Sequence, residues 1–369
     1  MSPAPRNSAI DMFKGIGIAL VVVGHAWALP EPVYQMIYSV GMAAFLLLAG
    51  AMFKHERAAA APVDYVRGKL MRLVVPAWGM GLLLALPYIA ALALGKFPPD
   101  EFVLRLRGTL TGSAINEWNF LSTPLWYLFC LFWLEVIATA LASRGARVAG
   151  GLMTLAGLLW IAVSQGGATW SDDNPLEWLF ALHSVGSAMA FFGAGLWLGG
   201  GRSAHAARGG IVDFTRVPMT TARGLVLLAV LVGWTLAVIY SPDVPNLSRN
   251  RVGMTPMAVI LNLGAALAGA ALLWQLVRLL PPSRWLCWLG QHTLPIFGFN
   301  YLVNKIVLMG AMRTGVGAAR LAHWWWAIAL LELALLCALA WLLDRTGPVG
   351  DLFNGRLLGR LRREKTRLA

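Results

Sequence analysis

Three ionisable side chains lie on one face of the first apolar segment, residues 10–29. Lys14 and His25 are eleven residues apart, which is about three helical turns, or roughly 16 Å along the axis. Asp11 precedes Lys14 by one turn and can pair with it. Such groups inside a lipid-spanning helix are costly and usually face a protein interior or an aqueous cavity. The segment therefore predicts one of two things. These residues either form a row of functional side chains, or are a lysine at a helix end and a histidine that hydrogen-bonds to a neighbouring helix.

Two further basic residues, Lys69 and Arg72, precede the third apolar segment, residues 73–95. They are one turn apart and face the same way if the chain is helical. Two cations near the start of a helix suit a phosphate group, and Lys14 would open onto the same surface. The ordinary excess of basic residues on the cytoplasmic side of membrane proteins explains the pair equally well.

The fourth apolar segment, residues 119–142, follows Glu117 and contains Trp126 near its start. Tryptophan is enriched at the membrane interface, so anchoring explains Trp126, and stacking on a sugar ring is the alternative. Glu135 lies deeper in the segment and needs a partner, which the sequence does not identify.

The ninth apolar segment, residues 286–309, carries a proline and several polar groups, including His292 and Asn300. This combination predicts a broken or cavity-facing helix. Glu332 in the tenth segment lies at a depth comparable to that of Asn300. It is therefore a candidate partner for one of these polar groups.

The composition places the whole chain in a membrane. Of its 369 residues, 58% are hydrophobic and 13% are charged, whereas a soluble domain carries about 25% charged residues. We expect an all-α polytopic protein with one transmembrane domain, residues 1–345, and a basic cytoplasmic tail, residues 346–369. Ten segments are long enough to span a bilayer: 10–29, 33–53, 73–95, 119–142, 148–164, 179–199, 223–240, 254–277, 286–309 and 324–343.

The net charge of +13 is explained by membrane topology. With both termini in the cytoplasm, most of the 30 lysines and arginines fall on the cytoplasmic side, as the positive-inside rule requires. The basic tail then predicts contact with lipid headgroups, and we expect no nucleic-acid partner. The three cysteines have neither metal-site nor disulfide spacing, and no nucleotide-binding loop is present. We therefore expect no metal, and ATP-driven transport gains no support.

Taken together, these stretches resemble the acyltransferase-3 family of integral membrane O-acyltransferases, within it the branch of fucose 4-O-acetylase-like and exopolysaccharide acetyltransferases. Ala49, Thr293, Phe297 and Asn300 depart from the family's residues at their positions. The resemblance covers essentially the whole chain. Its motifs are Lys14 and His25 with Asp11 and Gly24; Phe45-Leu-Leu-Leu-Ala49-Gly50; Lys69-Leu-Met-Arg72; Pro124-Leu-Trp126-Tyr127-Leu; and Gly290-Gln-His292-Thr293-Leu.

The resemblance implies a cytoplasmic acyl-CoA, most simply acetyl-CoA, as donor and co-substrate, and a sugar hydroxyl on the far side as acceptor. Lys14, Lys69 and Arg72 are the expected ligands of the CoA phosphates. Imidazole, with an unperturbed pKa of ~6.5, suits a general base, so His25 is expected to act as base or as transient acyl carrier. We place Asp11 and Lys14 with it in the catalytic row.

The acceptor site is expected at the outer side of the membrane. Glu117, Trp126 and Asn300 are the candidate substrate-binding residues. A carboxylate that orients the imidazole is expected by analogy with catalytic triads. Its candidates are Glu117, Asp172 and Asp173.

The expected location is the bacterial inner membrane, as a multi-pass protein whose partners are acyl-CoA, a sugar or glycan acceptor and the bilayer. A polysaccharide synthesis or export complex is a further candidate partner. The rival interpretation is a secondary transporter that exports polysaccharide units, since intramembrane His, Lys and Glu also serve proton-coupled carriers. We find no internal repeat of the kind that many carriers show. A third interpretation is a catalytically silent assembly partner of such a complex.

Overall fold

The computed structural model describes residues 7–26, 29–164, 181–199, 218–313 and 323–357. Regular structure in this part is helical, and one isolated bridge joins Asn246 to Arg251. Nine stretches of the described residues are long and apolar enough to cross a membrane. The expected all-α polytopic fold is therefore confirmed.

Nine of the ten expected spans correspond to single helices or short groups of helices. α4 (Pro62–Lys69), a π-helical turn (Leu70–Val74) and α5 (Val75–Ala93) together form the third span, which begins earlier than expected. The other spans are α1 (Ser8–His25), α2 (Glu31–Ala51), η3 (Thr123–Leu125) with α7 (Trp126–Ala140), α8 (Ala146–Ser164), α10 (Thr221–Tyr240), α11 (Pro256–Leu279), α13 (Thr293–Arg313) and α15 (Trp325–Asp344).

The remaining elements connect or flank the spans. The expected sixth span, residues 179–199, contains α9 (Val185–Gly199), which is shorter than a full span in the described part of the chain. The short helices are α3 (His55–Ala60), α6 (Pro99–Thr111), η2 (Asn116–Trp118), η4 (Ala142–Arg144), η6 (Leu182–Ser184), η7 (Leu247–Arg249), α12 (Arg284–Gln291) and α16 (Pro348–Phe353). The domain boundary at residue 345 stays a prediction; α16 follows it and packs on α5 and α15.

The ninth expected span is broken, as its proline and polar groups predicted. The break falls at His292, between α12 and α13, and Pro295 lies in the first turn of α13. A proline is tolerated there because the first backbone N–H groups of a helix have no intrahelical partner. His292 is buried, stacks on the ring of Trp288 and lies 3.5 Å from a carboxylate oxygen of Asp344.

α1 lies among α2, α11, α12, α13 and α15, and glycine allows its closest contact. A Cβ atom on Gly290 would lie 1.8 Å from the carbonyl oxygen of Asp11, and one on Gly15 would lie 2.1 Å from that of Leu286. The backbones of α1 and α12 therefore touch, as small residues allow in membrane helices. At the other end of α1, Asn304 of α13 meets His25. α1 and α13 thus run side by side in the same direction.

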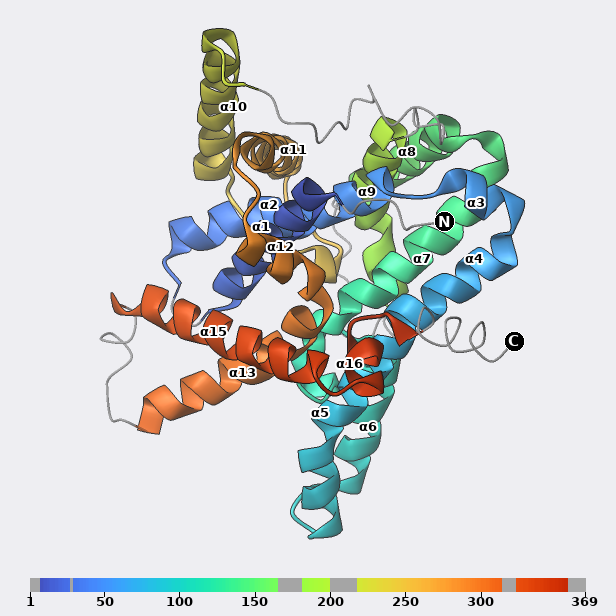
Figure 1. Ribbon diagram of the computed structural model, residues 1–369, viewed down its shortest axis with the longest axis vertical. Coiled ribbons are helices and arrows are strands. Elements are labelled where there is room, and N and C mark those ends of the chain that lie inside the picture. The colour runs from blue at the N-terminus through green and yellow to red at the C-terminus, as the bar shows by residue number, and fades with distance from the viewer. Residues whose placement is uncertain (1–6, 27–28, 165–180, 200–217, 314–322, 358–369) are drawn as a thin grey trace.

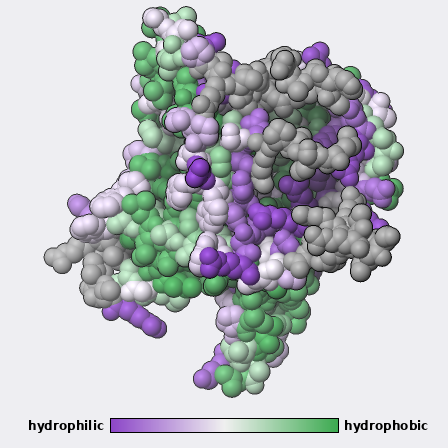
Figure 2. Space-filling model, viewed as in Figure 1, coloured by the Kyte–Doolittle hydropathy of each residue, from purple (hydrophilic) through white to green (hydrophobic). Residues whose placement is uncertain are grey.

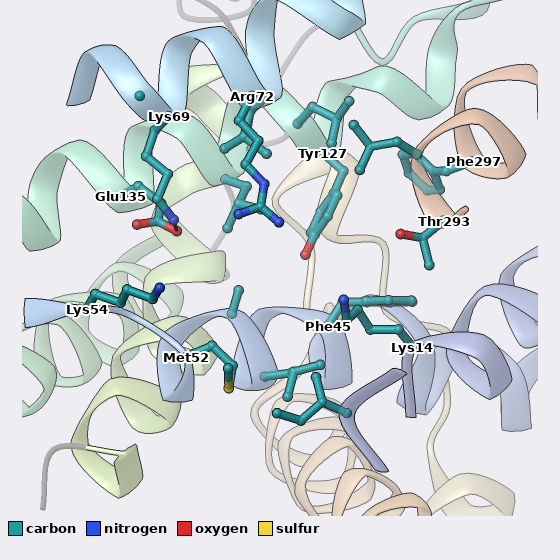
Figure 3. Close-up of a pocket in the computed structure, with 18 of the residues that line it drawn as sticks. Lys14, Phe45, Met52, Lys54, Lys69, Arg72, Tyr127, Glu135, Thr293 and Phe297 are labelled. Carbon is teal, nitrogen blue, oxygen red and sulfur yellow. Dashed lines mark hydrogen bonds and ion pairs between the residues drawn. The ribbon is translucent and has the colours of Figure 1, made fainter. Parts of the chain in front are cut away.

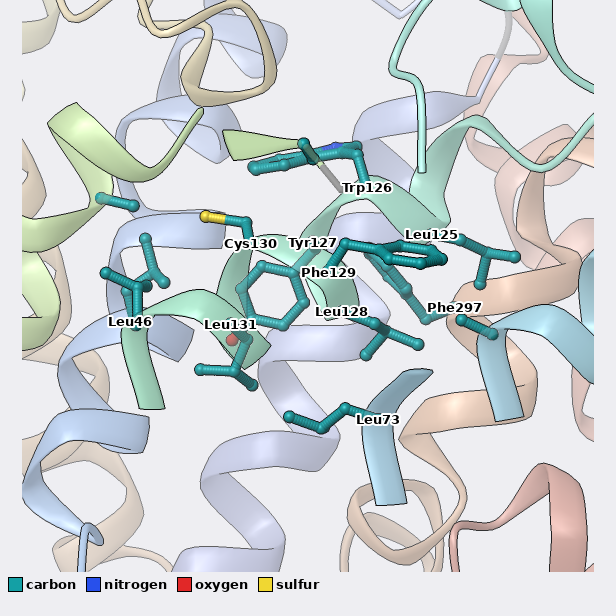
Figure 4. Close-up of a cluster of buried hydrophobic side chains, with 14 of the residues drawn as sticks. Leu46, Leu73, Leu125, Trp126, Tyr127, Leu128, Phe129, Cys130, Leu131 and Phe297 are labelled. Atoms are coloured by element: carbon teal, nitrogen blue, oxygen red, sulfur yellow. The ribbon is translucent and has the colours of Figure 1, made fainter. Parts of the chain in front are cut away.

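The periphery of the molecule is apolar, and its centre holds the core. Figure 1 shows α5 and α6 projecting together at the lower end and α10 standing at the upper left. Apolar groups cover the lower projection (Figure 2), and large apolar side chains are exposed along α8 and α10, as lipid contact requires. Inside, Phe129 and Leu134 of α7 are fully buried. Figure 4 shows the cluster around Tyr127, Phe129 and Phe297 that joins α7 to α13.

Candidate active site

A cavity of about 540 Å³ opens between α1, α2, α4, α7 and α13 (Figure 3). Its charged lining combines five cations with two carboxylates, so an excess of positive charge faces one enclosed space. Apolar side chains form the rest of the wall. The charged residues are Lys14, Lys54, Arg57, Lys69, Arg72, Asp64 and Glu135.

Lys69 and Arg72 both line this cavity, but they differ in what they contact. Lys69 forms an ion pair and hydrogen bond with Glu135 of α7, and the hydroxyl of Tyr65 donates to the same carboxylate at 3.2 Å. Arg72 lies in the π-helical turn, and its guanidinium points into the cavity (Figure 3). The described residues offer Arg72 no ion pair. Arg72 is therefore available for an anionic ligand, whereas Lys69 is largely neutralised.

Glu135 thus has the partner that its depth in the membrane demanded. Lys69 and Glu135 are 66 residues apart in the chain, and no local spacing connects them. Lys54 and Arg57 were also missed as site residues, because the sequence identified them only as cytoplasmic charges. They follow the end of α2, where α3 and α4 fold back along the bundle.

On α1, the Asp11–Lys14 pair that the spacing predicted is present. The ammonium nitrogen of Lys14 lies 3.7 Å from Oδ1 of Asp11. Asp11 is buried, and Gln291 of α12 donates to its other oxygen at 3.2 Å. Lys14 lines the cavity, while Asp11 lies behind it and ties α1 to α12. Both residues are at the opposite end of α1 from His25.

His25 is half-buried and is not among the residues that line the cavity. Its Nδ1 atom lies 2.8 Å from the carbonyl oxygen of Val21. A carbonyl only accepts, so Nδ1 carries the proton and, in the neutral ring, Nε2 keeps a free lone pair. Nε2 is the nitrogen that a general base would use. The ring of Tyr38 on α2 lies 6.0 Å away, centroid to centroid.

Three aromatic side chains in the cavity wall, which we call the ring layer, lie toward its His25 end. They are Phe45, Tyr127 and Phe297. The centroid of Tyr127 lies 6.4 Å from that of Phe45 and 5.7 Å from that of Phe297, and both contacts are T-shaped. Along α1 the lining ends at Ile18, seven residues or about 10 Å before His25. In this conformation the lining of the cavity therefore ends short of the imidazole.

Beyond the ring layer, Asn304 links His25 to a carboxylate. Its amide nitrogen donates to the backbone oxygen of His25 at 2.7 Å and to Oε1 of Glu332 at 3.0 Å. Glu332 of α15 is fully buried. The expectation that Glu332 answers a polar group of the ninth segment is confirmed, and the group is Asn304. Sequence reasoning gave Asn304 no role, although it follows Asn300 by one turn on the same face.

The candidate substrate-binding residues do not converge in the cavity. Glu117 is exposed in η2, and Trp126 is buried with its ring 6.0 Å from that of Tyr127. Asn300 is fully buried on α13, beyond the ring layer. Asp172 and Asp173 lie outside the described residues, as does the second half of the basic tail, residues 358–369.

These features belong to a membrane protein whose cation-lined cavity and histidine share one helix face. The acyltransferase-3 family, described as an acyltransferase domain, matches residues 7–344. The chain therefore belongs to this family and is a multi-pass membrane acyltransferase. Comparison with curated proteins and with solved structures gave no significant match.

Proposed function

We propose that the protein transfers an acyl group, most simply acetyl, from acyl-CoA to a sugar hydroxyl. The acceptor belongs to a surface or exported polysaccharide or to its lipid-linked precursor, and the membrane is the bacterial inner membrane. Fucose 4-O-acetylase-like enzymes and exopolysaccharide acetyltransferases are the proposed branch of the family. The observation that carries the proposal is the alignment of the cation-lined cavity with His25 along the same faces of α1 and α13.

The cavity suits the phosphate-rich end of the donor. Arg72, Lys54 and Arg57 join Lys14 as the proposed phosphate ligands, because each lines the cavity with a flexible cationic side chain. Charge-assisted hydrogen bonds from arginine and lysine are the usual means of holding phosphate groups. Lys69 takes a different proposed role, in which its bond to Glu135 anchors the wall of the cavity. With the positive-inside topology, this mouth faces the cytoplasm.

The transfer step is proposed to use Nε2 of His25. The sugar oxygen attacks the thioester carbonyl carbon while its proton passes to Nε2. The carbon–sulfur bond then breaks, and the CoA thiolate leaves and takes that proton from the imidazolium. The bond from Nδ1 to Val21 places the acceptor lone pair of the neutral ring on Nε2, before the sugar proton arrives and again after the thiolate has taken it. A covalent route, in which Nε2 carries the acyl group before the sugar receives it, uses the same atom.

Asn304 and Glu332 are proposed to position His25 rather than to touch the substrate. Their hydrogen bonds fix the backbone at the end of α1, and the imidazole is attached there. Since the cavity lining ends short of His25 and the ring layer lies at that end, the donor arm is proposed to displace these rings as it enters. A small shift of the Phe45 side chain is the simplest displacement, because its ring rests directly on Gly17, which has no side chain.

The test is acceptor-dependent release of the CoA thiol. Purified protein in lipid nanodiscs is mixed with acetyl-CoA, with and without a glycan acceptor, and free thiol and O-acetylated sugar are measured together. The proposal expects both products in equal amounts, and only when both substrates are present. A transporter or a silent assembly partner would release no thiol, and that result would contradict the proposal.

A further inference from the structure

The side chain of Asn300 has an unfilled hydrogen-bonding capacity. It has no solvent-exposed surface, and neither its amide nitrogen nor its amide oxygen has a hydrogen-bond partner among the described residues. An unpaired buried polar group costs free energy, and native structures retain few of them without a reason. Here the donor and the acceptor of one side-chain amide are both unpaired. A ligand that offers both an acceptor and a donor would therefore complement Asn300.

Its position places this amide between the cavity and His25. Thr293, Phe297, Asn300 and Asn304 follow one another at spacings of three or four residues, so they share one face of α13. Thr293 and Phe297 line the cavity, and Asn304 bonds to His25. Asn300 therefore lies about 4.5 Å beyond the ring of Phe297 in the axial direction and about 6 Å short of Asn304.

We propose that Asn300 pairs with the pantetheine arm at the amide that is nearest to the thioester and at the N–H group of the second amide. The Nδ2–H group of Asn300 would donate to the carbonyl of the first amide, and Oδ1 would accept from the N–H group of the second, because the C=O and N–H groups of one trans amide point in opposite directions. Both atoms of the asparagine amide would then be paired. A carboxylate, which only accepts, would leave Oδ1 unpaired, and a single hydroxyl would have to serve both atoms from one oxygen. The proposal rests on the proposed function, since it names how that donor is recognised.

The spacing along the donor matches the spacing along α13. The amide of the donor that is nearest to the thioester has its nitrogen four bonds from the thioester carbonyl carbon, or about 5 Å away in an extended chain. Asn304 is about 6 Å further along the helix than Asn300. A donor held at Asn300 therefore presents its thioester carbonyl at the level of Asn304 and of the end of α1, where His25 is attached.

The experiment combines a change in the donor with a change in the protein. Acetyl-CoA is compared with an analogue in which the amide nearest to the thioester is replaced by two methylene groups, and kcat/KM is measured for each. For the native protein we expect the analogue to be poorer by about 10- to 100-fold, because it leaves the buried Nδ2–H group of Asn300 unpaired. For Asn300→Leu we expect the two donors to differ by no more than about twofold, the usual limit of independent effects.

Asn262→Leu is the matched control. Asn262 of α11 is also a buried asparagine, but both atoms of its amide have hydrogen-bond partners. Its oxygen accepts from Ser241, and its nitrogen donates to the backbone oxygens of Asp243 and Val252. This variant is expected to lower the melting temperature and to keep the native discrimination between the donors. Asn300→Leu is expected to raise the melting temperature of the donor-free protein, because it removes an unpaired amide. Asn300→Ala replaces it if the larger side chain does not fit.

The outcomes separate this inference from the proposed function. If the native protein uses both donors equally, or if the Asn300 variants discriminate as the native protein does, the pairing is wrong. The proposed function then still stands, because acetyl-CoA is used. If the native protein does not use acetyl-CoA at all, the proposed function itself is wrong. A loss of discrimination confined to the Asn300 variants supports the pairing.

Discussion

The two ends of α1 hold their polar groups in opposite ways. At the Lys14 end, five cations line a cavity that only two carboxylates partly neutralise. At the His25 end, Asn304 and Glu332 are buried and bond to each other and to the backbone. The first arrangement is open and has an excess of positive charge, as the binding of a large anion requires. The second is buried and tied together by hydrogen bonds, as holding one reactive nitrogen in place requires.

The largest expected effect comes from the His25 end. His25→Ala should lower kcat for acyl transfer by about 10²- to 10⁴-fold, the range for a lost general base. Binding of acetyl-CoA should stay unchanged, because the cavity does not include His25. Turnover and the Kd of acetyl-CoA, measured on the same preparation, check this. Near-native turnover would remove His25 from the mechanism.

The Lys14 end predicts a loss of binding without a loss of chemistry. Replacing Arg72 and Lys54 together by alanine should weaken acetyl-CoA binding by about 10- to 100-fold, since charge-assisted contacts to phosphate are lost. At saturating donor kcat should stay close to native. Titration of the protein with acetyl-CoA at two salt concentrations should show that the Kd depends less on salt in the variant than in the native protein. A fall in kcat with unchanged binding would mean that donor binding and chemistry are not separated between the Lys14 end and the His25 end of α1.

Lys69 should behave unlike its neighbour Arg72. Lys69→Ala leaves the buried carboxylate of Glu135 with only Tyr65 as partner, so we expect a loss of about 1–3 kcal/mol in the free energy of unfolding. Lys69→Met with Glu135→Leu should recover most of it, because no buried charge remains. Thermal unfolding with a donor-binding measurement distinguishes the cases. If the Lys69→Ala protein is as stable as the native protein but binds the donor poorly, Lys69 is a phosphate ligand after all.

The smallest effect is expected at Asp11. Its contact with Lys14 is 3.7 Å long, and the lysine side chain is 28% exposed, so the pair contributes less than about 1 kcal/mol. Asp11→Asn keeps an acceptor for Gln291 and should change kcat and the KM for acetyl-CoA by no more than about twofold. Steady-state kinetics measure this directly. A large fall in kcat would give Asp11 a catalytic role that its distance from His25 does not suggest.

The sequence predicted what depends on local spacing. The apolar segments and the irregular ninth span follow from local composition, and the Asp11–Lys14 pair and the shared face of Lys14 and His25 follow from helical periodicity. Lys14, Lys69 and Arg72 were expected on one surface, and all three line the same cavity.

What the sequence could not predict depends on contacts between distant segments. Glu135 had no recognisable partner, because Lys69 reaches it only after α4 packs on α7. Asn304 and His25 are 279 residues apart, so their bond has no signature in either segment. The family resemblance named Phe45, Tyr127 and Phe297 at its motif positions but not their packing into the ring layer, because aromatic residues in apolar spans have an ordinary packing explanation.

The ring layer also has a consequence for the bilayer around the protein. A permanent aqueous passage from the cations past His25 would let protons and small ions cross along α1, and any energised membrane would lose its gradient through it. Tyr127 packs edge to face against Phe45 and Phe297 at the end of the cavity that lies toward His25. On the proposed function these rings would part only for the donor arm, which would keep the two compartments insulated between turnovers.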